Sequence, residues 1–353
     1  MDLPTYFTDF LKNIRPEPDD LDEFRAAHKE LREKLEADLG LSDIILSTFL
    51  QGSYRRATAI RPKPGKKGDV DVVVVTDIDK EQKTPQQALD TFKPFLDKHY
   101  KGKYVIQGRS IGISLTRVDL DLVATSAPSE VEKSVWKSMS FTEDRTLEDE
   151  EFVEKMTRAS AEWKLSPLEI PDREAKLWVP THPLKQIQAT QEKNARCNKH
   201  FVNVVKAIKW WRRKFVTPEY PRSYPVEHLI WHCCPDQIKT VAQGVTETLE
   251  TIVRDHKLKP FLPDHGVPQH DVFKRIIQKD YDEFYKQVAE AAVLARKALD
   301  EQDTEKSAKL WRELFGNDFP PYGGGTGGGS NGGSKGGYTP RDRPSNVGGA
   351  RFG

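Results

Sequence analysis

A strand that begins with two acids constrains this chain more than any other segment. In "GDVDVVVVT", Asp69 and Asp71 precede the valine run 72–75, and an unbroken β-branched run predicts a strand buried on both faces. Residues i and i+2 of a strand share a face, so the two carboxylates lie side by side. Because an unpaired buried carboxylate is costly, the pair needs a counter-charge, and a hard divalent cation suits it. On the doublet alone, a solvated acidic strand start stays the simpler alternative.

A second acidic strand strengthens the metal interpretation. "TRVDLDLVAT" carries Asp119 and Asp121 at the same spacing, and "QGS" upstream places Gly52 and Ser53 in a turn. If the two acidic strands are neighbours, three carboxylates meet at one sheet edge and can hold two Mg²⁺ ions. Phosphoryl transfer needs little beyond such positioning and charge neutralisation. The order of Gly-Ser, short loop, acid pair and distant acid therefore predicts a metal-dependent nucleotidyltransferase.

The N-terminal half mixes helices with strands. The expected elements are a helix at about 19–39, strands at 44–50 and 69–75, one amphipathic helix across 84–100, and two further strands within 104–125. The polar, proline-rich stretch of about 128–180 predicts an insertion or an inter-domain crossover.

The C-terminal half is helical up to about residue 320. "HFVNVVKAIKWWRRKF" places apolar residues on one face and Lys206, Lys209 and Arg213 on the other. We expect an α+β protein with a nucleotidyltransferase core at 1–180, which includes the helix at 19–39. A helical nucleotide-binding domain at 181–320 follows. The tail 321–353 is glycine-rich and too low in complexity to bury a core.

Charge and composition exclude several classes of protein. The formal net charge is only +1, so no global field recruits nucleic acid. No apolar run approaches the roughly 18 residues of a membrane span, and the N-terminus does not read as a secretory signal. Three cysteines cannot all pair within one chain, which favours a reducing cytoplasm.

Six segments together resemble one known family. They are "FLQGSYRRATAIRP", "DVDVVVV", "VDLDLVAT", "THPLKQIQATQEKNARCNKHFVNVVKAIKWW", "SYPVEHLI" and "AKLWRELFGNDFP". The chain resembles the bacterial CD-NTases, which are cGAS- and DncV-like enzymes of CBASS anti-phage systems, and is most similar to their clade D. The resemblance spans about residues 1–320. It implies a polymerase-β-like nucleotidyltransferase core with a mixed sheet, followed by a helical domain.

The resemblance also implies roles for individual residues. The residues that would contact the donor nucleotide are Gln51, Gly52, Ser53, Lys209, Ser223 and Tyr224. The residues that would bind metal and carry catalysis are Asp69, Asp71 and Asp121. Asp121 is preferred over Asp119 because the family's third acid directly precedes the hydrophobic end of its strand. Tyr224 would stack on the base, so Tyr224→Phe would be nearly silent. From the residues alone, a solvated helix position is the simpler interpretation of Lys209, and a helix N-cap is the simpler interpretation of Ser223.

The implied reaction joins nucleoside triphosphates into a cyclic messenger. The resemblance favours cyclic AMP-AMP-GMP made from ATP and GTP, with two Mg²⁺ ions that Mn²⁺ can replace, and a downstream effector that the product activates. A linear oligonucleotide polymerase, an inactive nucleotide-sensing scaffold and a nucleotidylating enzyme acting on a partner protein are the alternatives.

The tail ends in "GGARFG" and carries Tyr338, Arg341 and Phe352, which a partner could grip. In the systems that the resemblance points to, an E1–E2-like ubiquitin-transferase homologue conjugates the synthase through its last residue. This predicts that Gly353 is adenylated and transferred to a target amine. A disordered leftover is the alternative.

Two other sites compete for the remaining polar residues. His228 and His232 are four apart and lie next to Cys233 and Cys234, so a zinc site is conceivable; helix and core positions are the simpler interpretation. The basic loop 55–67 could bind nucleic acid, although solvated or phosphate-binding side chains are the simpler interpretation.

Overall fold

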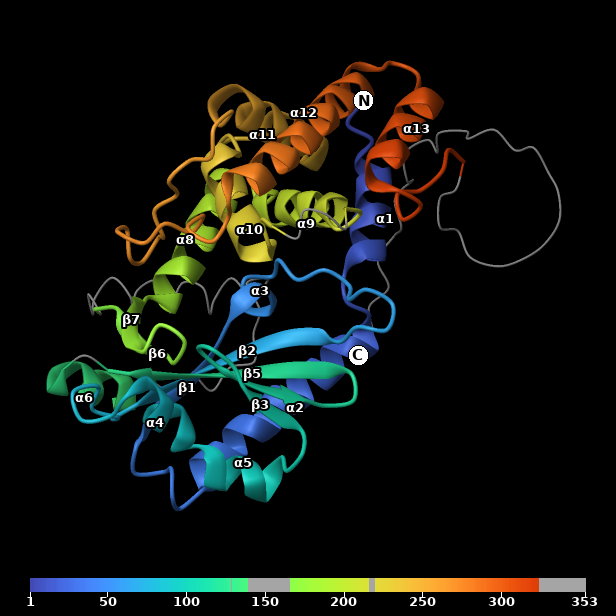
Figure 1. The fold of residues 1–353 in the computed structure, drawn as a ribbon. Coiled ribbons are helices and arrows are strands. Elements are labelled where there is room, and N and C mark those ends of the chain that lie inside the picture. The colour runs from blue at the N-terminus through green and yellow to red at the C-terminus, as the bar shows by residue number, and fades with distance from the viewer. Residues whose placement is uncertain (128, 139–165, 216–219, 324–353) are drawn as a thin grey trace, which may run out of the picture.

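The computed structural model describes residues 1–127, 129–138, 166–215 and 220–323. Figure 1 shows one sheet in the lower part of the molecule and a layer of helices above it, with the short helix α3 (Gly52–Arg55) between them. This arrangement confirms the expected α+β architecture. The tail that contains Gly353 lies outside the described residues.

The sheet has seven strands in mixed orientation. They are β1 (Ile45–Gln51), β2 (Gly68–Thr76), β3 (Tyr104–Ile106), β4 (Ile111–Ser114), β5 (Val118–Ser126), β6 (Leu168–Asp172) and β7 (Leu177–Thr181). Their order is β1-β2-β5-β4-β3, and β6 joins β5 to β7. The two acidic strands, β2 and β5, are direct neighbours and parallel, while the other pairs are antiparallel. The sequence-based condition for a three-carboxylate edge is therefore met.

The valine run of β2 is buried on both faces, as predicted. Val72, Val73, Val74 and Val75 are each 0% exposed. The even-numbered valines pack into the core formed with helices α2 (Pro18–Ala37), α4 (Pro85–Asp90) and α5 (Lys93–His99). The odd-numbered valines face the other core, under α6 (Glu130–Ser138) and α8 (Pro183–Arg196). Since side chains alternate along a strand, the two aspartates share the α8-side face of the sheet.

Three sequence-based expectations for the core need correction. The single helix expected across 84–100 is two helices, α4 and α5, because Pro94 in the first turn of α5 cannot continue a helix from the preceding turn. The two strands expected within 104–125 are three, β3 to β5. The polar stretch 128–180 contributes α6 and the β6–β7 hairpin, which extends the sheet; its residues 139–165 lie outside the described part.

The upper layer is built from helices at both ends of the chain. Its members are α1 (Pro4–Ile14), α9 (Phe201–Arg212), α10 (Ser223–Cys233), α11 (Val241–Asp255), α12 (Gln278–Asp300) and α13 (Thr304–Phe315). Phe7 of α1 packs edge-on against Trp311, Phe315 and Phe319, so the first helix belongs to this layer by packing although it precedes the core in sequence. None of the described helices is both long and apolar enough to cross a membrane.

Candidate active site

One register row of the sheet brings the predicted site residues together. Asp71 on β2 pairs with Gln51 on β1 and with Asp121 on β5. Paired residues of neighbouring strands point to the same face, so the row presents all three side chains on one side. Oxygen atoms of Asp69, Asp71 and Asp121 all lie within 4.8 Å of one another. We refer to these three acids as the carboxylate edge.

The carboxylate edge has no cation of its own. Among the described residues, no Lys or Arg forms an ion pair with any of its three acids. Loss of water from the carboxyl group, followed by the charges of Asp71 and Asp121, raises the pKa of Asp69 to about 7. Burial and the Asp121 charge raise the pKa of Asp71 to about 6, and burial also raises the pKa of Asp121. Three acids held in this way favour a bound cation.

Asp119 has different partners from Asp121, although the two lie on one strand. Ser114 donates a hydrogen bond of 2.6 Å to Asp119, and the Lys67 ammonium lies 3.6 Å from the same oxygen. Asp121 instead accepts longer hydrogen bonds from Gln107 (3.3 Å) and Ser110 (3.4 Å). The geometry thus groups Asp121, and not Asp119, with the β2 acids.

The Gly-Ser turn lies directly against the carboxylate edge. Gly52 has a φ of +74°, a conformation that favours glycine. A Cβ atom at this position would stand 1.8 Å from Oδ2 of Asp71. Only glycine therefore allows the backbone before half-buried Ser53 to approach the acids so closely.

A buried acid on α10 ties this turn to the helical layer. Glu227 is 7% exposed and accepts hydrogen bonds from Lys209 (2.6 Å), Thr58 (2.9 Å) and Arg56 (3.1 Å). The backbone N–H of Thr58 in turn donates to the carbonyl of Ser53 at 2.9 Å. Together these residues, from the loop after α3, from α9 and from α10, form what we call the Glu227 cluster. It connects the turn to both helices.

The Glu227 cluster corrects one expectation and adds residues that sequence reasoning missed. Lys209 is only 6% exposed, so it does not lie on a solvated helix face; its phosphate contact stays a prediction. Arg56, Thr58 and Glu227 had no predicted role. An acid inside the apolar stretch "VEHLI" was the available signal, because a buried carboxylate requires partners.

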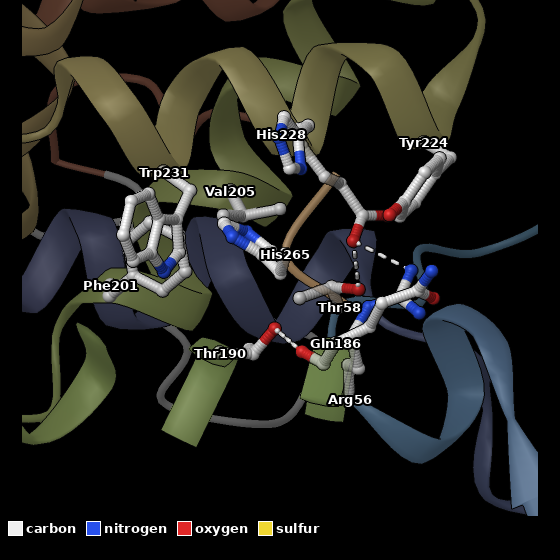
Figure 2. A pocket seen from close by; sticks show the side chains of 11 residues that line it. Arg56, Thr58, Gln186, Thr190, Phe201, Val205, Tyr224, His228, Trp231 and His265 are labelled. Atoms are coloured by element: carbon white, nitrogen blue, oxygen red, sulfur yellow. Dashed lines mark hydrogen bonds and ion pairs between the residues drawn. The ribbon is translucent and has the colours of Figure 1, made fainter. Parts of the chain in front are cut away.

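Tyr224 lies one turn before Glu227 and is engaged by its hydroxyl group. That hydroxyl donates to Asp264 Oδ2 at 2.7 Å, and the Arg56 guanidinium lies 5.5 Å from the ring centroid. The adjoining cavity, which Trp231 and His265 also line (Figure 2), measures about 20 Å³. This is room for one water molecule and not for a nucleobase. Base stacking by Tyr224 stays a prediction, and so does the small effect of Tyr224→Phe on nucleotide binding, while the hydroxyl contact with Asp264 makes a loss of stability the expected effect of that variant.

Neither competing site gains support from the structure. Arg55 and Arg56 of the basic loop are buried, and Arg61 pairs with Asp318 at 2.7 Å, so the loop is not one exposed basic surface. The three cysteines are buried free thiols. Within the described residues, the carboxylate edge is the only His, Cys, Asp or Glu group with metal-ligand spacing.

Comparison with known proteins shows the family. Residues 1–130, which contain the Gly-Ser turn and the carboxylate edge, match the Second Messenger Oligonucleotide or Dinucleotide Synthetase domain. The chain is 42% identical, over 92% of its length and 94% of theirs, to a probable cyclic AMP-AMP-GMP nucleotide synthase of Salmonella paratyphi B and a cyclic AMP-AMP-GMP synthase of Enterobacter hormaechei.

A solved structure supports the same assignment at the level of fold. CdnC of E. coli MS115-1, determined with ATP, superposes with a TM-score of 0.65 at 17% identity, over 90% of this chain and 99% of CdnC. A sequence identity of 17% shows only a shared fold, whereas the two relatives that are 42% identical establish the family. The chain therefore belongs to the CD-NTases, the nucleotidyltransferases that synthesise cyclic oligonucleotides.

Proposed function

We propose that this protein condenses ATP and GTP into cyclic AMP-AMP-GMP, as a messenger in anti-phage defence, with release of pyrophosphate. The observation that carries the reaction type is the carboxylate edge, where three acids face the Gly-Ser turn and no Lys or Arg of the described residues pairs with them. The names of the two relatives that are 42% identical support this product.

The carboxylate edge fits a divalent metal. Carboxylate oxygens are the ligands that Mg²⁺ prefers, and Mn²⁺ accepts the same donors. We infer that Asp69 and Asp71 hold two ions together and that Asp121 contributes to one of them. When bound, such ions neutralise the triphosphate charge and increase the acidity of the attacking hydroxyl.

The residues of this chain would then bind and orient the nucleotides. The backbone at Gly52 and the Gln51 and Ser53 side chains would receive the triphosphate, with Lys209 and Ser223 reaching it from the helical layer. Tyr224 would stack on the base through its ring face. A ribose 3′-hydroxyl or 2′-hydroxyl, placed next to Asp121, would attack the α-phosphorus, and the bond to the leaving pyrophosphate would break.

Mass spectrometry of the products from an equimolar mixture of the four NTPs and Mg²⁺ tests this function. We expect one product with two adenosine monophosphates and one guanosine monophosphate, resistant to phosphatase because a ring has no terminal phosphate. A phosphatase-sensitive ladder would instead establish a linear polymerase. Release of no pyrophosphate from any mixture would establish an inactive scaffold, and label on a partner protein would establish nucleotidylation.

We further propose an E1–E2-like partner acting at Gly353, and an effector that the cyclic product activates. The composition of the tail supports the partner: glycine leaves the carboxylate accessible, and nearby aromatic and basic residues offer contacts. Incubation with an E1–E2-like protein and ATP should give a covalent adduct on a denaturing gel. Gly353→Glu should abolish the adduct and leave basal synthesis unchanged. An adduct that survives this substitution rejects Gly353 as the acyl donor.

A further inference from the structure

The short turn between β3 and β4 contacts the third acid of the carboxylate edge. This turn, residues 107–110, is closed by the N–H of Gln107, which donates to the Ser110 carbonyl at 2.9 Å. The Gln107 side chain donates through Nε2 to Oδ1 of Asp121 at 3.3 Å. The single proton of the Ser110 hydroxyl is shared between the same Oδ1 (3.4 Å) and Oε1 of Gln107 (3.3 Å). Two side chains therefore meet on one oxygen of Asp121.

Both donors are neutral, and both leave the second oxygen of Asp121 available. No hydrogen bond within the described residues reaches Oδ2 of this acid. Because a carboxylate is planar, donors that hold one of its oxygens also fix the direction of the other. An amide and a hydroxyl can do this without supplying a counter-charge that would compete with a metal ion. Asp119 differs in this respect, since the Lys67 ammonium lies 3.6 Å from its carboxylate.

A glycine on β4 makes room for the Gln107 amide. Gly112 pairs with Asp121 across the two strands. A Cβ atom at this position would lie 2.4 Å from Nε2 of Gln107. Since Nε2 is the end of a flexible side chain, an added methyl group would displace the amide and not the strand. Glycine at position 112 therefore permits the contact between Gln107 and Asp121.

The β6–β7 hairpin holds the middle of the same turn. Nε of Arg109 lies 2.6 Å from Oδ2 of Asp172, which is only 3% exposed. The backbone N–H of Arg173 donates to the Gly108 carbonyl at 2.9 Å. These two contacts fix the turn from the side of the hairpin, so the donors at its two ends are held in place against the carboxylate edge.

We propose that Gln107 and Ser110 are positioning residues, which hold the Asp121 carboxylate in the orientation that binds a metal ion. Neither the motifs nor the family comparison assigns them a role. They contact the acid, so they act through it on the ion. The inference rests on the proposed function, because it requires a divalent ion at the carboxylate edge. Partners of this kind contribute about 10- to 100-fold to metal affinity in other proteins.

Titration of the full chain with Mn²⁺, in the absence of nucleotide, tests the proposal, with the electron paramagnetic resonance signal of free Mn²⁺ as the readout. Gln107→Met keeps the size of the side chain and removes the donor. We expect it to weaken Mn²⁺ binding roughly two- to tenfold, the range for one hydrogen bond. Ser110→Ala should act similarly, and the double variant should lose about 10- to 100-fold. Gly112→Ala should match Gln107→Met, because it displaces the same amide.

Ser114→Ala is the matched control. The Ser114 hydroxyl donates a shorter hydrogen bond, 2.6 Å, to Asp119 on the same strand, so its loss tests whether any such bond to β5 changes metal affinity. We expect this control to bind Mn²⁺ as wild type does. Gln107 is exposed, so Gln107→Met should keep the wild-type melting temperature. This variant also keeps the test decisive if Ser110→Ala fails to fold.

The outcomes separate the positioning role from the metal site itself. Wild-type Mn²⁺ affinity in Gln107→Met and Gly112→Ala overturns the positioning role while leaving the carboxylate edge as the metal site. An equal loss of affinity in Ser114→Ala overturns it as well, because the effect would not be specific to Asp121. Wild-type protein that binds no Mn²⁺ refutes the metal site and the positioning role together. Since the titration measures no catalysis, a product other than the proposed one would leave its result unchanged.

Discussion

Acidic side chains lie in opposite surroundings at the carboxylate edge and in the Glu227 cluster. At the edge, Asp69, Asp71 and Asp121 face one another with no paired cation among the described residues. In the cluster, Glu227 accepts hydrogen bonds from two cations and a hydroxyl. Their pKa values move apart accordingly. Burial raises that of Asp71 to about 6, whereas the Lys209 and Arg56 charges overcome burial and lower that of Glu227.

The difference shows that the partners of an acidic side chain indicate its role. The Glu227 carboxylate has its hydrogen-bond and charge partners within the protein, so it can hold the Gly-Ser turn and α9 in fixed positions. The carboxylate edge lacks a counter-charge, and three ionised carboxylates are stable side by side only when a cation binds between them. Carboxylates therefore serve attachment in one place, and in the other they have the arrangement of a metal site. The predictions below test this contrast, from the largest expected effect to the smallest.

Removing charge from the carboxylate edge should abolish activity without harming the fold. Asp69→Asn combined with Asp71→Asn should reduce product formation about a thousandfold or more, because several kcal/mol of metal-dependent charge stabilisation are lost. The melting temperature of the metal-free protein should rise, since the repulsion disappears. Pyrophosphate release and thermal denaturation measure the two effects. Asp119→Asn is the matched control and should be much milder; activity of the double variant within a few-fold of wild type would refute the site.

The same charge removal in the Glu227 cluster should destabilise the protein. Glu227→Gln leaves Arg56 and Lys209 buried without a counter-charge, and breaking such a pair costs about 3–5 kcal/mol. Urea denaturation measures the loss. Glu305→Gln provides the control, because its partner Lys309 is exposed and a surface pair contributes only about 0–1 kcal/mol. A Glu227→Gln protein as stable as wild type would show that the cluster does not hold the layers together.

The two regions should respond to pH with opposite signs. The pKa of Asp69 is about 7 in the folded protein, against an ordinary value of 3.8. Its protonated form therefore stabilises the metal-free fold below pH ~4, and this contribution is lost as the pH rises through about 7. The stability of the Asp69→Asn, Asp71→Asn double variant should therefore increase relative to that of wild type as the pH rises from about 4 to about 7.

The pKa of Glu227 is lowered instead, from an ordinary value of 4.5. Its contribution is present above that value and is lost as the pH falls. The stability penalty of Glu227→Gln should therefore shrink in acid. Urea unfolding of the two variants and of wild type across pH measures both trends. If the unfolding free energies of all three proteins changed with pH in parallel, the two regions would not differ as proposed.

The smallest effect concerns Tyr224, whose hydroxyl the cluster does not need. Tyr224→Phe should lose about 1 kcal/mol of stability with its hydrogen bond to Asp264. Tyr224→Ala should in addition weaken nucleotide binding by about 1–3 kcal/mol, the contribution of one base stack. Comparing the two variants by denaturation and by nucleotide titration separates the hydroxyl from the ring. Equal nucleotide affinity in both would reject stacking.

Much of the carboxylate edge could be predicted because patterns of neighbouring residues within one strand determine it. Alternation along a strand places Asp69 beside Asp71, and the valine run requires burial on both faces, which the structure bears out. Glycine before Ser53 indicates a turn that other residues could not adopt. Local patterns predicted other elements less well. Pro94 divides the helix expected across 84–100 into two. The β6–β7 hairpin lies in a stretch that is too polar to suggest strands.

The sequence by itself determined the two acidic strands, the acid pairs, the α+β class and, through its motifs, the resemblance to the CD-NTases. Only the tertiary structure decided that β2 and β5 are parallel neighbours in the register that sets Asp71 beside Asp121. It alone decided that Lys209 is buried against Glu227. Periodicity along the chain reveals which face a side chain takes. Charge pairing depends instead on distances between segments that lie far apart in the chain, such as those of Arg56 and Glu227, which are 171 residues apart.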